Sequence, residues 1–415
     1  MGTLKTILQT SSVGRPITPN LKYGGTARVI IYLDREFTRL GYDSLVAATG
    51  DSRVIGRLIE TVPRSISLWN MDGERNAVIK PRKEHDELSE KHYQIILETI
   101  LKYKNIDIVH DHPGSGLISS KKFREVGDQI KTPILVTLHG AFSDRYAERY
   151  TLWNKVALEK GNIYFNAISH SQKRAFEERG FRVSATIYHG IPIEYFPFRN
   201  EKLDYLFSLG RICPKKGQHT AIQIAKETGM PLIIGGEVNS AHNNYWKENV
   251  ESYLDFSITE IPEKEHEDYK NNLVEKLNAG ENIIDEGQII FVGNLDDRQK
   301  IAFYERAKAF MMPINWPEPF GLTMIESMAC GTPVIAYSVG SVPEVIKDGK
   351  TGFIVEKTGN EEIDLAKMIE AVNNIVYINP KDCRKHIAEN FSITREAKDY
   401  LNLYKKLLGN FKYDA

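Results

Sequence analysis

Short apolar runs alternate with helix-forming segments along the whole chain, and this alternation restricts the fold more than any other feature. Each run spans only a few residues, as in strands that are buried on both faces of a parallel sheet. Repeated strand–helix units predict an α/β fold with doubly wound sheets. We expect strands at Thr6–Gln9, Ser44–Ala48, Ile106–His110, Ile134–Leu138, Tyr164–Ile168, Ser184–Tyr188, Tyr205–Leu209, Leu232–Gly235, Ile289–Val292, Ala309–Met312, Val334–Ala336 and Gly352–Val355.

The length of the chain favours two domains. A single hydrophobic core rarely grows beyond roughly 250–300 residues, and this chain has 415. The strand–helix rhythm breaks at residues 191–200, where Pro192 and Pro197 precede a charged stretch. Because linkers have this composition, the sequence predicts an N-terminal domain over residues 1–192 and a C-terminal domain over 193–390.

Two further segments stand apart from this pattern. Residues 239–286 are polar and strongly charged, which is typical of a surface insertion that is helical in parts. The C-terminal residues 391–415 carry apolar side chains at helical spacing between Thr394 and Leu408. The apolar stripe of this last helix needs a surface to cover, and its spacing leaves open which domain supplies that surface.

Composition restricts the class of protein. Hydrophobic residues make up 41% of the chain and charged residues 26%, with a net charge of −1. These are ordinary values for a globular protein and argue against a nucleic-acid binder. The three cysteines form no CxxC pair, so we expect no zinc or redox site and a reducing, cytoplasmic compartment. We expect no signal peptide and no membrane-spanning segment, which leaves only peripheral membrane contact open.

The segment Pro317–Glu326 (PEPFGLTMIE) carries the strongest chemical signal. A helix is expected to begin near Leu322, and its first backbone N–H groups would form an anion site, with Gly321 permitting a close approach. Glu326 falls at the edge of the apolar stripe of this helix, where a carboxylate needs donors such as ribose or sugar hydroxyls. The alternative is that Glu318 is an ordinary acid at a helix N-terminus and that Glu326 is solvated.

A basic loop follows the first expected strand of the C-terminal domain. Gly210–Gly217 (GRICPKKG) contains Arg211, which offers a planar fork of donors, and Lys216, which offers a point charge. The two cations suit a diphosphate, and the carboxyl end of such a strand borders the ligand crevice of an α/β sheet. The alternative is a solvated basic turn.

Paired glycines stand between the first strand and the helix expected at Ala27–Leu40. Gly24 and Gly25 let the backbone approach a phosphate or a sugar, although close packing of strand on helix would need small residues here as well. No GxGxxG fingerprint is present, so a dinucleotide site is not predicted.

Histidines follow several strands of the N-terminal domain. His139 comes directly after the strand at Ile134–Leu138 and should project at the carboxyl edge of the sheet, although a structural histidine would also suit this position. His110 and His112 have no third ligand at a suitable spacing, so we expect no metal site.

Taken together, these segments resemble the retaining glycosyltransferases of family 4. The resemblance runs over nearly the whole chain and implies the GT-B fold, in which two Rossmann-like domains face each other across a cleft and the last helix crosses back to the N-terminal domain. The charged insertion is longer than usual for this family. The motifs that carry the resemblance are Tyr23–Gly25, Asp107–His112, Thr137–Gly140, Ala167–Ser171, His189–Ile191, Gly210–Gly217, Phe291–Gly293, Glu318–Glu326, Met328–Ala336, Gly340–Glu344 and Asp348–Phe353.

The resemblance also implies roles for individual residues. The basic pair holds the donor diphosphate, Glu326 binds the ribose hydroxyls, and Glu318 holds the donor sugar and phosphate. The residues expected to act in catalysis are His139, Glu318, Arg211 and Lys216. The residues expected to contact the donor are Gly24, Gly25, Arg211, Lys216, Gly293, Glu318, Phe320, Gly321, Leu322 and Glu326.

The reaction that the resemblance implies moves a hexosyl group from a nucleoside-diphosphate sugar to a hydroxyl of a sugar, a lipid-linked compound or a small molecule. UDP- and GDP-linked donors both remain open. No cofactor is expected, and the absence of a DxD motif argues against a required metal. The alternatives are a nucleotide-sugar epimerase or hydrolase of the same fold, and a non-catalytic nucleotide-sugar-binding subunit.

Overall fold

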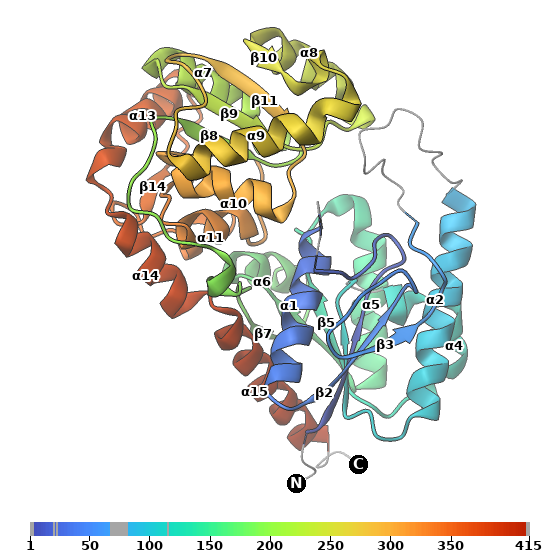
Figure 1. Ribbon diagram of the computed structural model, residues 1–415. Coiled ribbons are helices and arrows are strands. Elements are labelled where there is room, and N and C mark those ends of the chain that lie inside the picture. Colours follow the sequence, from blue (N-terminus) through green and yellow to red (C-terminus); the bar gives the residue numbers. More distant parts are fainter. Residues whose placement is uncertain (1–3, 20, 22–23, 67–81, 114–115, 412–415) are drawn as a thin grey trace. The chain divides into compact units, whose positions relative to one another are not determined.

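The computed structural model describes residues 4–19, 21, 24–66, 82–113 and 116–411 (Figure 1). These residues form two compact units. The first unit combines the described residues up to Gly190 with those from Ile393 onward, and the second unit is Ile191–Ser392. The expected boundary lay at residues 192/193, two positions further along the chain.

The first unit is built on a parallel sheet of seven strands in the order β3-β2-β1-β4-β5-β6-β7. Register is regular through the centre of the sheet, where Leu8 pairs with Leu45 on one side and with Val109 on the other. The strands are β1 (Thr6–Thr10), β2 (Asp43–Ala48), β3 (Arg57–Glu60), β4 (Ile108–Asp111), β5 (Ile134–Leu138), β6 (Ile163–Ala167) and β7 (Val183–Thr186). The helices are α1 (Gly25–Arg39), α2 (Arg82–Lys102), α3 (Gly116–Ser119), α4 (Lys121–Val126), α5 (Ala147–Lys160), α6 (His170–Glu177) and α15 (Ile393–Phe411).

Helices cover both faces of this sheet, because alternate strand residues point to opposite sides. Leu45 and Ala47 of β2 enter a core that includes Leu97 of α2. Their neighbours Val46 and Ala48 enter a second core on the side of α1. Strands such as β5 (ILVTL) are therefore mostly apolar, and this explains why their short apolar runs could be found in the sequence.

The last helix, α15, belongs to the first unit and packs beside α1 (Figure 1). Its apolar stripe includes Tyr400 and Tyr404, both fully buried. The Tyr404 hydroxyl lies 2.6 Å from His110 Nδ1, and the Tyr400 hydroxyl lies 3.3 Å from Thr137 Oγ1. Residues from the end of the chain thus complete the core beneath β4 and β5.

The second unit repeats the same plan. Its parallel sheet has the strand order β10-β11-β9-β8-β12-β13-β14. The strands are β8 (Leu206–Leu209), β9 (Leu232–Gly235), β10 (Phe256–Ser257), β11 (Ile289–Gly293), β12 (Ala309–Met312), β13 (Val334–Tyr337) and β14 (Gly352–Val355). The helices are α7 (Gln218–Thr228), α8 (Asn243–Asn249), α9 (His266–Ala279), α10 (Asp297–Arg306), α11 (Leu322–Ala329), α12 (Val342–Val345), α13 (Glu361–Asn374) and α14 (Pro380–Asn390).

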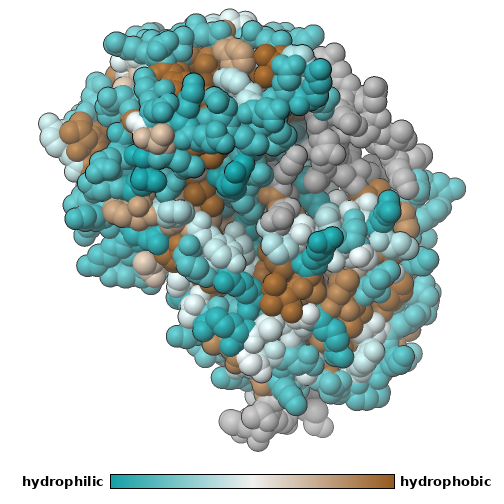
Figure 2. Space-filling model, in the orientation of Figure 1, coloured by the Kyte–Doolittle hydropathy of each residue, from teal (hydrophilic) through white to brown (hydrophobic). Residues whose placement is uncertain are grey.

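The charged segment 239–286 is more closely integrated into the second unit than its composition suggests. It contains α8 and α9, and also the short edge strand β10, which pairs with β11. Leu273 and Leu277 of α9 are buried, while the surface over this helix is mostly hydrophilic in the view of Figure 2. The segment is therefore helical in parts, as expected, and it also extends the sheet.

Parallel strands with helices on both sheet faces confirm the predicted α/β architecture of two Rossmann-like units. Two strands were not predicted. Residues Arg57–Glu60 of β3 are half-exposed or exposed at the sheet edge, and β10 has only two residues. Neither presents the continuous apolar run by which the other strands were found.

Candidate functional site

The strand order of the second unit reverses between β8 and β12. From β8 the chain continues to β9 on one side, whereas β12 leads to β13 and β14 on the other. In open α/β sheets, ligands bind beyond the carboxyl ends of the strands at such a reversal. The loops that leave β8 and β12 are joined directly, because the Asn315 amide donates to the Lys215 carbonyl over 2.9 Å. The two strongest sequence signals therefore lie at one point of the sheet.

An ion pair links these two loops. Lys216 Nζ lies 2.8 Å from Glu318 Oε2, and both side chains are partly exposed, at 28% and 13%. The Trp316 indole donates to the same oxygen, Oε2 of Glu318, over 2.8 Å. The ammonium groups of Lys215 and Lys216 lie 5.1 and 5.7 Å from the centre of the Trp316 ring. Glu318 is thus a fixed hydrogen-bond acceptor beside two cations, rather than a solvated helix acid.

Arg211 follows β8 in the same basic loop and is half-buried. Its carbonyl accepts a hydrogen bond from Gln218 Nε2 over 2.9 Å, so the first residues of α7 hold the loop backbone in place. Both predicted cations follow β8 in the structure: Arg211 precedes the short turn Pro214–Lys216, and Lys216 is the last residue of that turn.

Three glycines bring backbones close together at the carboxyl ends of β8, β9 and β11. The Gly236 amide donates to the Gly293 carbonyl over 2.8 Å. A Cβ atom at Gly236 would stand 1.9 Å from the Gly210 carbonyl oxygen, so no other residue fits there without moving the loop. Gly293, expected to approach a donor, ends β11 with φ of 71°.

Helix α11 starts where the Glu318 loop ends. Gly321 is its N-cap with φ of 85°, and Leu322 is its first residue. Phe320 is buried, and its carbonyl accepts from Ser341 Oγ over 2.7 Å. The next loop braces Glu318 closely, because a Cβ at Gly340 would lie 2.4 Å from the Glu318 backbone nitrogen.

Glu326 is more deeply buried than the sequence predicted. Its residue exposure is 2%, and its Oε1 accepts from Lys300 Nζ over 2.7 Å. Lys300 lies on α10, is also buried, and reaches Asp297 Oδ1 at 3.0 Å. The alternative of a solvated Glu326 is therefore wrong, and one donor to this withdrawn carboxylate is a buried lysine. Among the described residues, none donates to the second oxygen, Oε2.

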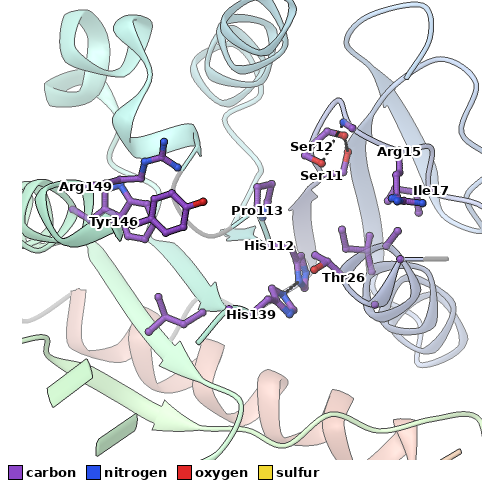
Figure 3. Close-up of a pocket in the computed structure, with 18 of the residues that line it drawn as sticks. Ser11, Ser12, Arg15, Ile17, Thr26, His112, Pro113, His139, Tyr146 and Arg149 are labelled. Atoms are coloured by element: carbon purple, nitrogen blue, oxygen red, sulfur yellow. Dashed lines mark hydrogen bonds between the residues drawn. The ribbon is translucent and has the colours of Figure 1, made fainter. Parts of the chain in front are cut away.

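The first unit has its own cavity at the corresponding place in its sheet. Its strand order reverses between β1 and β4, and the cavity of about 600 Å³ is lined from the loops that follow β1, β4 and β5. Gly24, Gly25 and His139 all line it. Figure 3 shows His112 and His139 between two walls, one carrying Ser11, Ser12 and Arg15 and the other Tyr146 and Arg149. Asn20, Lys22 and Tyr23 of the expected loop lie outside the described residues.

Histidines form a chain of contacts from this cavity into the core. His139 Nε2 lies 3.2 Å from His112 Nδ1, and the His139 ring stacks on His189 with centroids 5.2 Å apart. His189 in turn contacts buried Glu396 of α15, with Nδ1 and Oε1 2.9 Å apart. Burial, reinforced by neighbouring histidines, lowers the pKa of His112 and His139 well below the usual range. Both rings are therefore neutral at pH 7.

Two features are absent from the part of the chain that the structure describes. No helix there has the length and apolarity required to cross a bilayer. No group of three or more His, Cys, Asp or Glu side chains there is arranged to hold a metal ion.

Lys300 and Trp316 were not identified from the sequence, and Gly340 was named only within a motif of the family resemblance. Trp316 stands two residues before Glu318 and carried a weak signal, because an indole near a charged loop often finds an acceptor. Lys300 carried none, since it is one charged residue in an ordinary amphipathic helix. Only the packing of α10 against α11 brings it to Glu326.

Comparison with known proteins supports a family assignment. Residues 195–389 match the family model described as glycosyl transferases group 1. The alpha-maltose-1-phosphate synthase of Mycolicibacterium smegmatis is 37% identical over 109 residues, 24% of this chain and 28% of that protein. An uncharacterised glycosyltransferase of Methanocaldococcus jannaschii is 24% identical over 71% of both chains. Other curated relatives are matched over about a third of their own length.

Solved structures resemble the chain over its whole length. The sucrose-phosphate synthase of Thermosynechococcus elongatus gives a TM-score of 0.66 at 18% identity, over 98% of this chain and 100% of that one. The Anabaena protein HepE, solved with UDP and glucose, gives 0.63 at 17% identity, over 97% and 100%. At these identities the likeness concerns the fold, which is GT-B.

Proposed function

We propose that this chain is a glycosyltransferase that moves a hexosyl group from a nucleoside-diphosphate sugar to an acceptor hydroxyl, because residues 195–389 match the model of group 1 glycosyl transferases and the fold is GT-B. The anomeric configuration is retained, the donor base is uracil or guanine, and the protein works in the cytoplasm. The observation that carries the proposal is the Lys216–Glu318 bridge across the strand reversal of the second unit.

Lys216 and Arg211 hold the donor diphosphate in this proposal. A diphosphate that enters this loop gives the Lys216 ammonium a stronger acceptor than Glu318, with two phosphate charges against one carboxylate charge. The N-terminus of α11, at Leu322, adds backbone N–H groups and the positive end of the helix dipole. Together these groups stabilise the negative charge that grows as the diphosphate leaves, which takes the place of a metal.

Glu326 binds the ribose hydroxyls through Oε2, while Lys300 fixes Oε1. The buried pair therefore holds the carboxylate in one orientation before the donor arrives. Preorganisation of this kind reduces the cost of binding, because no side chain has to be ordered at that moment.

The reaction breaks the bond between the anomeric carbon and the diphosphate oxygen, and forms a bond from that carbon to the acceptor oxygen on the same face. The acceptor proton passes to the departing phosphate oxygen, so no enzymic nucleophile is needed. Glu318 and the backbone of Phe320, Gly321 and Leu322 hold the donor sugar and phosphate. Gly293, at the end of β11, approaches the donor from the second unit.

The test measures donor binding to the second unit by thermal shift, using a panel of nucleotides and nucleotide sugars. A donor at about 100 times its Kd adds about 2.7 kcal/mol of stability, or roughly 5–10 °C. We expect this shift in the wild type and its loss in Lys216→Ala. Lys308→Ala is the matched control, because Lys308 forms an exposed ion pair of similar length, 2.7 Å, with Asp204.

Product analysis then separates the alternative functions. A glycosylated acceptor supports the transferase, whereas a new sugar isomer or free sugar without acceptor would indicate an epimerase or hydrolase. Donor binding with no turnover across the acceptor panel would indicate a non-catalytic subunit. Full donor binding by the Lys216→Ala variant would contradict the proposed diphosphate site.

A further inference from the structure

Among the described residues that line the cavity of the first unit, cationic side chains have no acidic counterparts. Its lining includes two arginines, Arg15 and Arg149, and among the described residues that line it none is Asp or Glu. Most of the remaining lining is small, apolar or neutral, with the serine hydroxyls of Ser11 and Ser12 beside it. A cavity of about 600 Å³ is in the range that holds a small molecule. Its charge therefore favours an anion over a neutral ligand.

Arg149 lies in the first turn of α5, on the wall that Figure 3 shows beside Tyr146. Its guanidinium carbon is 5.4 Å from the centre of the Tyr146 ring, a cation–π contact that leaves the edge of the fork open to a ligand. No described carboxylate lies within 4.0 Å of it. Arg149 also lines a second cavity, whose lining mixes four lysines with four acids, Asp86, Glu87, Glu90 and Glu125.

Arg15 lies on the opposite wall, in the loop after β1 (Figure 3). It packs against the start of α1, because a Cβ at Gly24 would stand 3.2 Å from Arg15 Cδ. Gly24 also has φ of 127°, a backbone conformation that L side chains rarely adopt. Glycine at this position thus leaves room for the arginine beside the positive end of the α1 dipole, and α1 has no acidic residue in its first turn.

The floor of the cavity, formed by His112 and His139 between the two walls, does not offset this positive charge. His112 and His139 are neutral, so they present ring nitrogens as hydrogen-bond donors or acceptors and add no negative charge. Neutral polar groups of this kind suit hydroxyl groups. The cavity therefore combines a place for hydroxyls at its floor with cations on both walls.

We propose that this cavity binds the acceptor, and that the acceptor is a small hydroxyl compound carrying a phosphate or carboxylate, which Arg149 binds with Arg15 opposite. This inference rests on the proposed transferase function and narrows the acceptor class, since a neutral sugar makes no use of the two cations. Guanidinium recognises either anion through paired hydrogen bonds.

The experiment compares acceptors in matched pairs, with the donor that the thermal-shift panel identifies. The pairs are glucose with glucose 6-phosphate, glycerol with glycerol 3-phosphate, and glycerol with glycerate, so that phosphate and carboxylate are tested separately. Transfer is followed by the mass of the glycosylated acceptor. We expect the anionic member of at least one pair to be preferred about tenfold or more in kcat/KM.

Three variants test whether Arg149 binds the anionic group of the acceptor. Arg149→Gln should lower kcat/KM for the anionic acceptor about 10- to 100-fold, with donor affinity unchanged. Arg149→Lys should recover part of that loss, because it keeps the charge without the fork. Arg145→Gln is the control, because the Arg145 guanidinium lies 5.7 Å from the same Tyr146 ring and lines neither described cavity.

Preference for the neutral member of every pair would overturn the inference, as would equal effects of the Arg149 and Arg145 substitutions. Rejection of every anionic acceptor would overturn it as well. A wild-type protein that binds no nucleotide sugar would contradict the proposed function instead, because the proposed diphosphate site lies in the second unit and not in this cavity.

Discussion

Replacing Lys300 by methionine should destabilise the second unit strongly. The Lys300–Glu326 pair is almost fully buried, with side-chain exposures of 6% and 2%. Removing the lysine leaves a carboxylate that is withdrawn from water and has lost its cation. Breaking a buried pair in this way costs about 3–5 kcal/mol. For a unit of about this size each kcal/mol lowers the melting temperature by roughly 2–4 °C, so we expect a fall of roughly 6–20 °C.

The control is Lys308→Met, which breaks the exposed Lys308–Asp204 pair at the same N–O distance of 2.7 Å. Water solvates Asp204, whose side chain is 83% exposed, so the loss should be at most about 1 kcal/mol. The double variant Lys300→Met/Glu326→Met removes both buried charges and should return to within about 1–2 kcal/mol of the wild type. Differential scanning calorimetry measures all three. If the Lys300→Met and Lys308→Met variants have the same melting temperature, the burial argument is refuted.

Two further predictions concern the braced loop and the buried histidines. Gly340→Ala should weaken donor binding about tenfold or more, because φ is 58° and the new Cβ would displace the Glu318 backbone. The control is Gly349→Ala, where φ is 67° and the space around the residue is open. This control should cost about 1 kcal/mol of stability and leave donor binding intact. Isothermal titration measures the difference, and equal donor affinities in the two variants would count against the brace. Burial lowers the pKa of His92 to about 4, so between that value and the unfolded pKa of about 6.5 only the unfolded chain binds the proton. The free energy of unfolding therefore falls by about 1.3 kcal/mol between pH 7.5 and 5.5. In urea unfolding of the His92→Asn variant, this loss should be smaller by the same amount. An unchanged pH dependence in the variant would contradict the assignment.

Most of the fold could be predicted from the sequence, because a parallel sheet covered on both faces requires continuous apolar strands. β1, β2 and β5 were found for this reason, and all are buried along nearly their whole length. Strands that lie at an edge have no such requirement. β3 has exposed residues at both ends and half-buried residues between them, and the two-residue strand β10 joins the sheet by pairing with β11.

The candidate site divides along similar lines. Glu318 and Lys216 were expected to contact the same donor, because the family resemblance implies it. Their direct contact with each other could not be predicted, since it depends on the β8–β12 neighbourhood, which no local pattern encodes. The burial of Glu326 was underestimated for the same reason. Helical spacing shows which face of α11 a residue occupies, but it does not show that the Lys300 ammonium contacts Glu326 from α10.

The return of α15 to the first unit has a consequence for biosynthesis. Tyr400 and Tyr404 fill the core beneath β4 and β5, yet more than two hundred residues of a complete second unit are translated before them. The nascent first unit must therefore persist with His110 and Thr137 uncovered until the ribosome reaches the last helix. Synthesis of the whole second unit precedes α15, so the core of the first unit, which contains the earliest residues, is completed last.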